Sequence, residues 1–120
     1  MLFRSFLNID NKKMSKSLGN FFTVRDILKK YSGQVVRFFM LFAHYRNPLN
    51  FSDTLLDAAK NSYERILNCV ASLDFLLKGS RPASLSDKER DLLKEADEIE
   101  ISFRKAMDDD FNTADALSAI

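Results

Sequence analysis

The sequence contains a single cysteine, no tryptophan, three glycines and two prolines among its 120 residues. One cysteine, Cys69, excludes an internal disulfide, and its place in an apolar helical pattern predicts a buried thiol rather than a nucleophile. No apolar run approaches the length of a membrane span, and the first residues lack the basic and apolar regions of a signal peptide. We therefore expect a cytoplasmic protein without membrane contact.

Charge is distributed unevenly along the chain. Residues 1–46 contain nine lysines and arginines against two acids, a net charge of +7, whereas the remaining residues contain nine bases and fifteen acids, a net charge of −6. A basic first part suggests a polyanionic partner, either nucleotide phosphates or a nucleic-acid backbone. A solvated basic surface is the alternative interpretation.

Two helices are expected after a short strand over residues 6–9. Thr23 and Asp26 have the spacing of a capping box, which predicts a helix that begins at Thr23 and stops near Gly33. A second helix is expected over residues 34–45, where the density of phenylalanine predicts burial on several sides.

The rest of the chain predicts a pair of long helices. Ser52 is a good N-cap for a helix that closes at Gly79, and Ser86 with Glu89 forms a second capping box. Because the two helices are joined by a short loop, we expect them to pack antiparallel. Thr113 predicts the start of a further helix. Apolar residues recur three and four positions apart, as in a bundle seam, at Leu56, Ala59, Tyr63, Ile66, Val70, Leu73 and Leu77, and again at Leu92, Ala96, Ile99, Phe103 and Ala106.

The segment Lys13-Met14-Ser15-Lys16-Ser17, or KMSKS, carries the clearest chemical signal and is expected to lie in a loop over residues 12–20. Its two ammonium groups, three residues apart, can reach a triphosphate, and lysine is a flexible charge that suits a moving phosphate. The serine hydroxyls and the N–H groups of the loop can add hydrogen bonds. On the pattern alone, a solvated basic turn remains the alternative.

KMSKS followed by Leu18-Gly19-Asn20 resembles the second signature of class I aminoacyl-tRNA synthetases. The flanking sequences resemble the cysteinyl-tRNA synthetases most closely, and the similarity runs in order from Phe6 to Ile120. The blocks that carry this resemblance are Phe6–Asp10, Asn20–Asp26, Ala43–Arg46, Pro48–Ser52 and Met107–Thr113.

The resemblance implies a cysteine–tRNA ligase that uses ATP with Mg²⁺ to make cysteinyl-adenylate and transfers the cysteine to tRNA(Cys). It implies that Lys16 and Lys13 stabilise charge on the β- and γ-phosphates, and that Met14, Ser15 and Ser17 complete the ATP-binding loop. It also implies a HIGH signature and zinc ligands upstream of this segment. One cysteine and one histidine are too few for that zinc site, so we expect no metal ligands here and no cysteine activation by the chain alone.

A few other residues have both a functional and a structural interpretation. Arg37 and Arg46 are candidates for contact with the tRNA backbone, and a salt bridge is an equal alternative for each. We expect His44 to be structural, since nothing near it in the sequence forms a triad. Residues 108–110, all aspartate, predict a helix boundary with one N-cap rather than a metal site.

The sequence as a whole predicts a mainly α fold. We expect residues 1–22 to be the end of a Rossmann-like catalytic domain with its KMSKS loop, residues 23–51 to be a helical connecting region that contacts the tRNA stem, and residues 52–120 to begin a truncated antiparallel bundle. Residues 1–5 depart from the family pattern, and we interpret them as an artefact of sequence assembly. The alternatives are a non-catalytic helical module that binds RNA or protein, and a related ATP-dependent cysteine ligase with a small-molecule acceptor.

Overall fold

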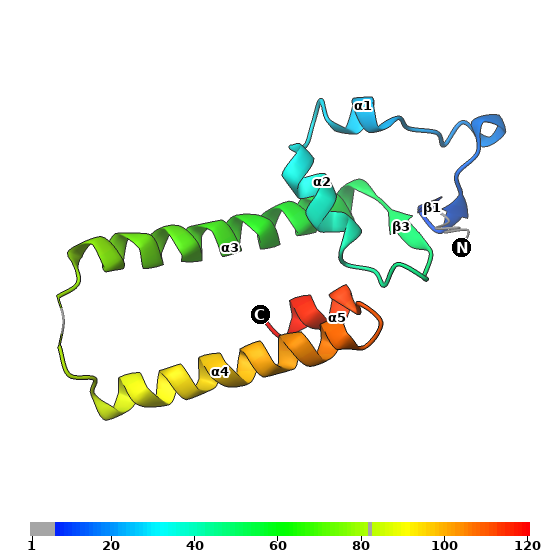
Figure 1. Ribbon diagram of the computed structural model, residues 1–120. Coiled ribbons are helices and arrows are strands. Elements are labelled where there is room, and N and C mark those ends of the chain that lie inside the picture. Colours follow the sequence, from blue (N-terminus) through cyan, green and yellow to red (C-terminus); the bar gives the residue numbers. More distant parts are fainter. Residues whose placement is uncertain (1–6, 82) are drawn as a thin grey trace. The chain divides into compact units, whose positions relative to one another are not determined.

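The computed structural model describes residues 7–81 and 83–120 and is mainly helical, as predicted (Figure 1). It divides into two compact units, residues 1–66 and 67–120, which meet inside the longest helix. The first unit contains β1 (Leu7–Ile9), β2 (Lys12–Lys13), a 3-10 turn (Lys16–Leu18), α1 (Val24–Ile27), α2 (Gly33–Met40), β3 (Leu49–Phe51) and the first part of α3 (Asp53–Gly79). The second unit contains the rest of α3, α4 (Asp87–Asp108) and α5 (Thr113–Ser118).

A three-stranded sheet with the order β2-β1-β3 forms one side of the first unit. The predicted strand is present as β1, although Phe6 lies outside the described residues. β2, which was expected to be part of a loop, pairs antiparallel with β1 through a turn in which Asp10 and Asn11 have φ values of 47° and 62°. Asp and Asn tolerate this left-handed conformation, which suits a tight hairpin.

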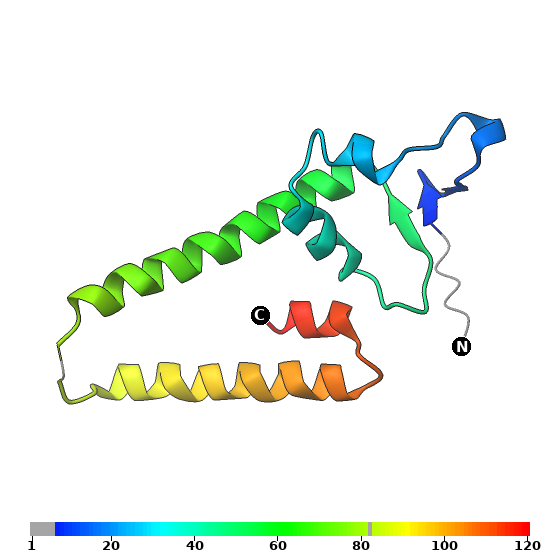
Figure 2. The same cartoon turned by 45° about the horizontal axis from the view of Figure 1, so that its top comes forward.

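The third strand comes from a distant part of the chain. β3 lies beside β1 in both views (Figures 1 and 2) and runs parallel to it, with Leu7 opposite Leu49 and Ile9 opposite Phe51. The connection between the two strands contains α1 and α2, as a parallel crossover requires. Because this pairing joins residues some forty positions apart, no local pattern in the sequence indicated it.

The two short helices differ from the predicted pair at their ends. The capping box at α1 is confirmed, since Thr23 Oγ1 accepts from the Asp26 N–H at 3.2 Å. The helix is only one turn long, however, because Ser32 caps a new helix by accepting from the Val35 N–H at 3.3 Å. Gly33, the expected stop, is therefore the first residue of α2.

α2 ends at Met40, five residues before the predicted end. The chain leaves the helix there because it must reach β3, which pairs with β1 from residue 49 onward. Phe39 is buried, as predicted for the phenylalanine-rich segment, whereas Phe42 is 43% exposed. The segment is therefore buried on one face and not on several.

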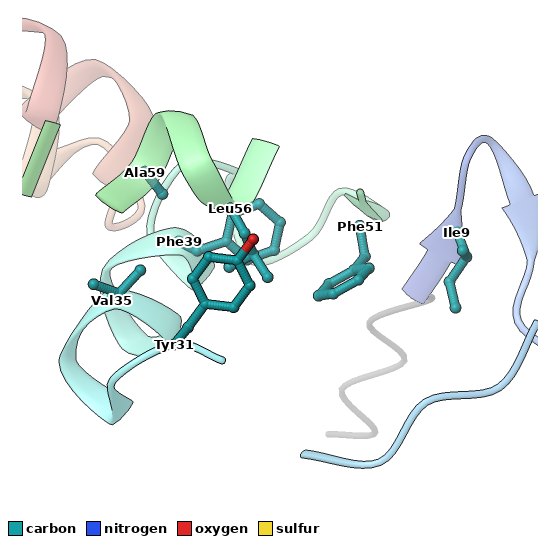
Figure 3. Packing of buried hydrophobic residues seen from close by; sticks show 7 residues of the cluster. All are labelled: Ile9, Tyr31, Val35, Phe39, Phe51, Leu56 and Ala59. Atoms are coloured by element: carbon teal, nitrogen blue, oxygen red, sulfur yellow. The ribbon is translucent and has the colours of Figure 1, made fainter. Parts of the chain in front are cut away.

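The core of the first unit joins the sheet to α2 and the start of α3 (Figure 3). Phe39 and Phe51 meet edge to face with ring centroids 6.1 Å apart, and Leu56 is fully buried. The Tyr31 hydroxyl donates a hydrogen bond of 2.8 Å to Asp57, which ties the segment between α1 and α2 to α3. The buried cluster is made of Ile9, Tyr31, Val35, Phe39, Phe51, Leu56 and Ala59.

α3 begins and ends as predicted, with Ser52 Oγ accepting from the Leu55 N–H at 3.2 Å and Gly79 as its last residue. Its apolar stripe is buried at Leu56 and Ala59, where it faces the core, but Val70, Leu73 and Leu77 are at least half exposed. Cys69 is exposed as well, so the predicted burial of its thiol is wrong: the stripe is covered only along its first turns. The antiparallel pairing of the two long helices stays a prediction.

In the second unit α4 begins with the predicted capping box of Ser86 and Glu89. α5 folds back against α4 (Figure 1), and its Ala116 is buried. The cap of α5 is Asn112, which accepts from the Asp115 N–H at 3.2 Å, one residue before the predicted Thr113. The aspartates at 108–110 lie at the helix boundary as predicted, although none of them is the N-cap.

Across the described ranges, no helix combines the length and the apolar composition that crossing a bilayer requires. In the same part of the chain, no three His, Cys, Asp or Glu side chains are grouped so that they could hold a metal ion.

Candidate functional site

The KMSKS segment leaves the sheet as an extended strand and then turns sharply. β2 ends at Lys13, and Ser15 is still extended with φ −151° and ψ 138°. A single 3-10 turn begins at Lys16, where the Leu18 N–H donates to the Ser15 carbonyl at 3.2 Å. Gly19 ends this turn at φ 68°, a conformation that glycine adopts without the steric cost of a side chain.

The loop stands on a hairpin that is clipped to the core. The Asp10 N–H donates to the Phe51 carbonyl at 3.2 Å, and the Asn11 N–H donates to Asn50 Oδ1 at 2.8 Å. Met14, a predicted ATP-binding residue, is half-buried and packs against the hydrophobic cluster. Its side chain therefore anchors the loop, while Lys13 on one side is exposed and Ser15 on the other is half-buried.

The two lysines of the motif present their charges to solvent. Both side chains are exposed, and within residues 7–81 and 83–120 neither ammonium group forms an ion pair with a carboxylate. Lys16 Nζ lies over the Phe21 ring, 5.3 Å from its centroid. An exposed cation–π contact stabilises by only about 0.5–1 kcal/mol, so it does not hold Lys16 away from a stronger anionic partner.

The serine hydroxyls of the motif lie next to each other, with Ser15 Oγ 2.7 Å from Ser17 Oγ. Either hydroxyl can donate, and Ser17 is exposed. Two ammonium groups and two hydroxyls on five consecutive residues form a compact set of donors that can donate hydrogen bonds to the oxygens of a phosphate chain.

Asn20 follows the KMSKS motif and was not predicted to be a functional residue. Its side chain bonds the loop twice, because Oδ1 accepts from the Ser15 N–H at 2.9 Å and Nδ2 donates to the Lys13 carbonyl at 3.2 Å. The only signal in the sequence was an asparagine just after a glycine, a residue type that often bonds nearby backbone groups.

The other candidate residues lie apart from the loop in the sequence and in the fold. Arg37 is exposed on α2, whereas His44 and Arg46 follow α2 on the way to β3. The His44 ring stacks on Tyr45 with a centroid distance of 4.7 Å, and Arg46 Nε donates to the Tyr45 hydroxyl at 3.0 Å. These contacts give His44 and Arg46 a structural environment, and they leave a tRNA contact of Arg37 or Arg46 as a prediction.

Comparison with known protein families places the loop within a recognised domain. Residues 1–61 match the family described as the class I (C) tRNA synthetase catalytic domain, which includes the sheet, the KMSKS loop and the start of α3. Residues 102–120 match the DALR domain, over the end of α4 and α5.

Individual relatives agree with this match. The chain is 56% identical over 116 residues to a cysteine–tRNA ligase of Lachnospira eligens, 55% identical over 115 residues to one of Clostridioides difficile, and 52% identical over 120 residues to one of Lachnoclostridium phytofermentans. These matches cover 97%, 96% and 96% of this chain and 25%, 25% and 26% of the relatives, so the chain spans about a quarter of their length. On this match and on the loop geometry, the chain belongs to the class I (C) tRNA synthetase family.

Proposed function

We propose that this chain supplies the ATP-phosphate loop of a cysteine–tRNA ligase. The observation that carries the proposal is the pair of exposed lysines, Lys13 and Lys16, on a loop anchored to the core and without carboxylate partners among the described residues. The names of the relatives support cysteine as the amino acid and tRNA as the acceptor.

The proposed reaction has two steps. A carboxylate oxygen of cysteine attacks the α-phosphorus of ATP, the bond to the β-phosphate oxygen breaks, and cysteinyl-adenylate and pyrophosphate form. A hydroxyl at the tRNA(Cys) 3′ end then attacks the adenylate carbonyl and releases AMP. Negative charge grows on the departing pyrophosphate in the first step, so Lys16 and Lys13 stabilise the transition state more than bound ATP.

The remaining parts of the loop have supporting roles in this proposal. Ser15 and Ser17 donate hydrogen bonds to phosphate oxygens, and Met14 fixes the backbone by its packing. Mg²⁺ enters with ATP, and we propose no ligand for it or for zinc within this chain. The family resemblance implies zinc ligands upstream of this segment, and we propose none among the described residues.

The wider assignments are proposals of the same kind. We propose that residues 1–22, 23–51 and 52–120 belong to the catalytic domain, the connecting region and a helical bundle domain. We also propose that Arg37 and Arg46 contact the tRNA backbone and that the protein acts in the cytoplasm. The exposure of Arg37 on α2 supports its availability to a polyanion.

A graft tests the catalytic role. The matched quarter of the Lachnospira eligens ligase is replaced by this chain, and cysteine-dependent exchange between ATP and pyrophosphate is measured. We expect the graft to be active and Lys16→Ala to lower kcat by about 100-fold with a smaller change in KM for ATP, because a lost transition-state charge acts mainly on kcat. The ungrafted 120-residue chain is expected to show no exchange.

The matched control is Lys60→Ala, which removes the same charge from an exposed position on α3, where Lys60 Nζ lies 3.9 Å from Glu64. It should leave kcat within about twofold, because exposed ion pairs contribute little. An active graft in which Lys16→Ala and Lys60→Ala behave alike would show that Lys16 has no electrostatic role.

A further inference from the structure

We propose that Asn20 is a positioning residue that holds the KMSKS loop in the shape in which Lys13 and Lys16 meet a polyphosphate. This inference rests on the proposed function of the loop. It starts from the two hydrogen bonds of a single side chain, one from the Ser15 N–H at 2.9 Å and one to the Lys13 carbonyl at 3.2 Å.

The alternation of the backbone explains why one side chain can make both bonds. In an extended strand the polar groups of successive residues point to opposite edges. The Met14 N–H points to β1 and donates to the Leu7 carbonyl at 3.3 Å, so the Lys13 carbonyl and the Ser15 N–H both face the other edge. That edge carries no strand of the described sheet, in which β2 is the outer member.

The primary amide of asparagine has the donor and the acceptor of a peptide group. Asn20 therefore takes the place of a missing neighbouring strand, with Oδ1 as its carbonyl and Nδ2 as its N–H. The turn over Lys16–Leu18 and Gly19 at φ 68° bring Asn20 back alongside the strand, where it is half-buried.

This arrangement sets the direction of both lysines. Lys13 carries one of the clamped backbone groups, and Lys16 directly follows the other clamped residue, Ser15. If the clamp is lost, the segment from Lys13 to Ser15 is held only along the edge that faces β1. The ammonium groups of Lys13 and Lys16 then spend less time at the separation that a triphosphate requires. Misplacement of this kind reduces rate more than affinity, because orientation is needed most in the transition state.

In the active graft described above, we expect Asn20→Ala to lower kcat by about tenfold, the effect of one or two hydrogen bonds, with KM for ATP changed by less than about threefold. The control is Asn61→Ala, the same substitution at an exposed position of α3. The control should match the unmodified graft. Thermal melts of both variants show whether any loss comes from unfolding.

A double-mutant cycle with Lys16 separates positioning from a general structural effect. If Asn20 acts by placing the lysines, Asn20→Ala should cost less than about twofold once Lys16 is already alanine, because the two residues act as a unit. An equal loss in both backgrounds, or a loss no greater than that of Asn61→Ala, would overturn the inference.

A measurement without catalysis keeps this result distinct from a failure of the proposed function. In the 120-residue chain, hydrogen exchange of the Ser15 amide should accelerate at least tenfold in Asn20→Ala and remain unchanged in Asn61→Ala. If Lys16→Ala leaves the graft fully active while Ser15 exchange responds as expected, the proposed function fails although the clamp exists. If Ser15 exchange does not respond, the clamp itself is refuted.

Discussion

Replacing Leu56 with alanine tests whether the core of the first unit holds the loop-bearing hairpin in place. Leu56 is 0% exposed and belongs to the cluster that joins α3 to β1 and β3. The substitution removes three carbon atoms, a transfer free energy of about 2.4 kcal/mol at about 0.8 kcal/mol per carbon. The cavity that remains raises the expected cost to about 3–5 kcal/mol. A unit of this size has a total stability of about 3–9 kcal/mol, so the variant should lose at least about a third of it.

Urea unfolding followed by tyrosine fluorescence is the appropriate assay. The chain has no tryptophan, and its three tyrosines, Tyr31, Tyr45 and Tyr63, all lie in the first unit. The signal therefore reports this unit alone. Leu55→Ala is the matched control, because Leu55 is the preceding residue of α3 and is 43% exposed. Because Leu55 already exposes 43% of its surface, its substitution should cost about 1.4 kcal/mol, the remaining share of about 2.4 kcal/mol. Equal midpoints for the two variants would refute the described core.

Two further predictions concern side-chain hydrogen bonds. Tyr31→Phe should cost about 1 kcal/mol of unfolding free energy near pH 8. Burial, and then the Asp57 carboxylate, raise the pKa of Tyr31. The wild type should therefore lose this advantage as the pH rises above the ordinary tyrosine pKa of about 10, which urea midpoints measured up to about pH 11 will show. A difference between the two proteins that stays constant with pH would contradict this reasoning. Ser86→Ala should fray the start of α4, measured as lower ellipticity at 222 nm and as a rise in the Glu89 pKa, which the Ser86 hydroxyl now lowers. Ser102→Ala, inside the same helix, should instead raise helicity slightly, and similar losses in both variants would argue against the cap.

The features that the sequence predicted well are those set by a few neighbouring residues. The capping boxes at Thr23 and Ser86 and the N-cap at Ser52 are confirmed, because side chain and backbone meet within three residues. The sheet could not be predicted in this way. β2 is only two residues long, and β3 finds its partner across the whole connection from β1.

The predicted ends of the helices in the connection between β1 and β3 were wrong for a related reason. The apolar spacing up to Tyr31 suits a longer α1, and the phenylalanines favour a longer α2. α1 ends before Ser32 because Ser32 caps α2, and α2 ends early enough for Leu49 to pair opposite Leu7. The exposure of Cys69 shows the same limit, because an apolar stripe indicates a buried face but not what covers it.

At the candidate site, the sequence indicated the motif but not the hydrogen bonds that hold its backbone. KMSKS indicates a phosphate loop through its resemblance to a family signature, whereas the two Asn20 hydrogen bonds depend on a strand edge that only the hairpin creates. Asn20 has no special meaning until β2 exists and leaves the Lys13 carbonyl and the Ser15 N–H without a neighbouring strand. Sequence reasoning therefore named the lysines that we propose to meet ATP, and it missed Asn20, whose side chain bonds the loop twice.

The distribution of interactions around the loop matches the work proposed for it. Buried apolar contacts end at Met14, and beyond it the loop is held by hydrogen bonds that contribute only about 0.5–1.5 kcal/mol each. The base of the loop has buried apolar contacts in addition to hydrogen bonds, since Asn50 and Phe51 bond the hairpin turn and both Ile9 and Phe51 are buried. In the proposed reaction, a lysine that follows the departing pyrophosphate needs a loop whose base is fixed and whose tip can move. A fully buried loop would hold Lys16 still, whereas an unclamped one would spread its charge over many positions, so the weak clamp is the arrangement that allows both order and movement.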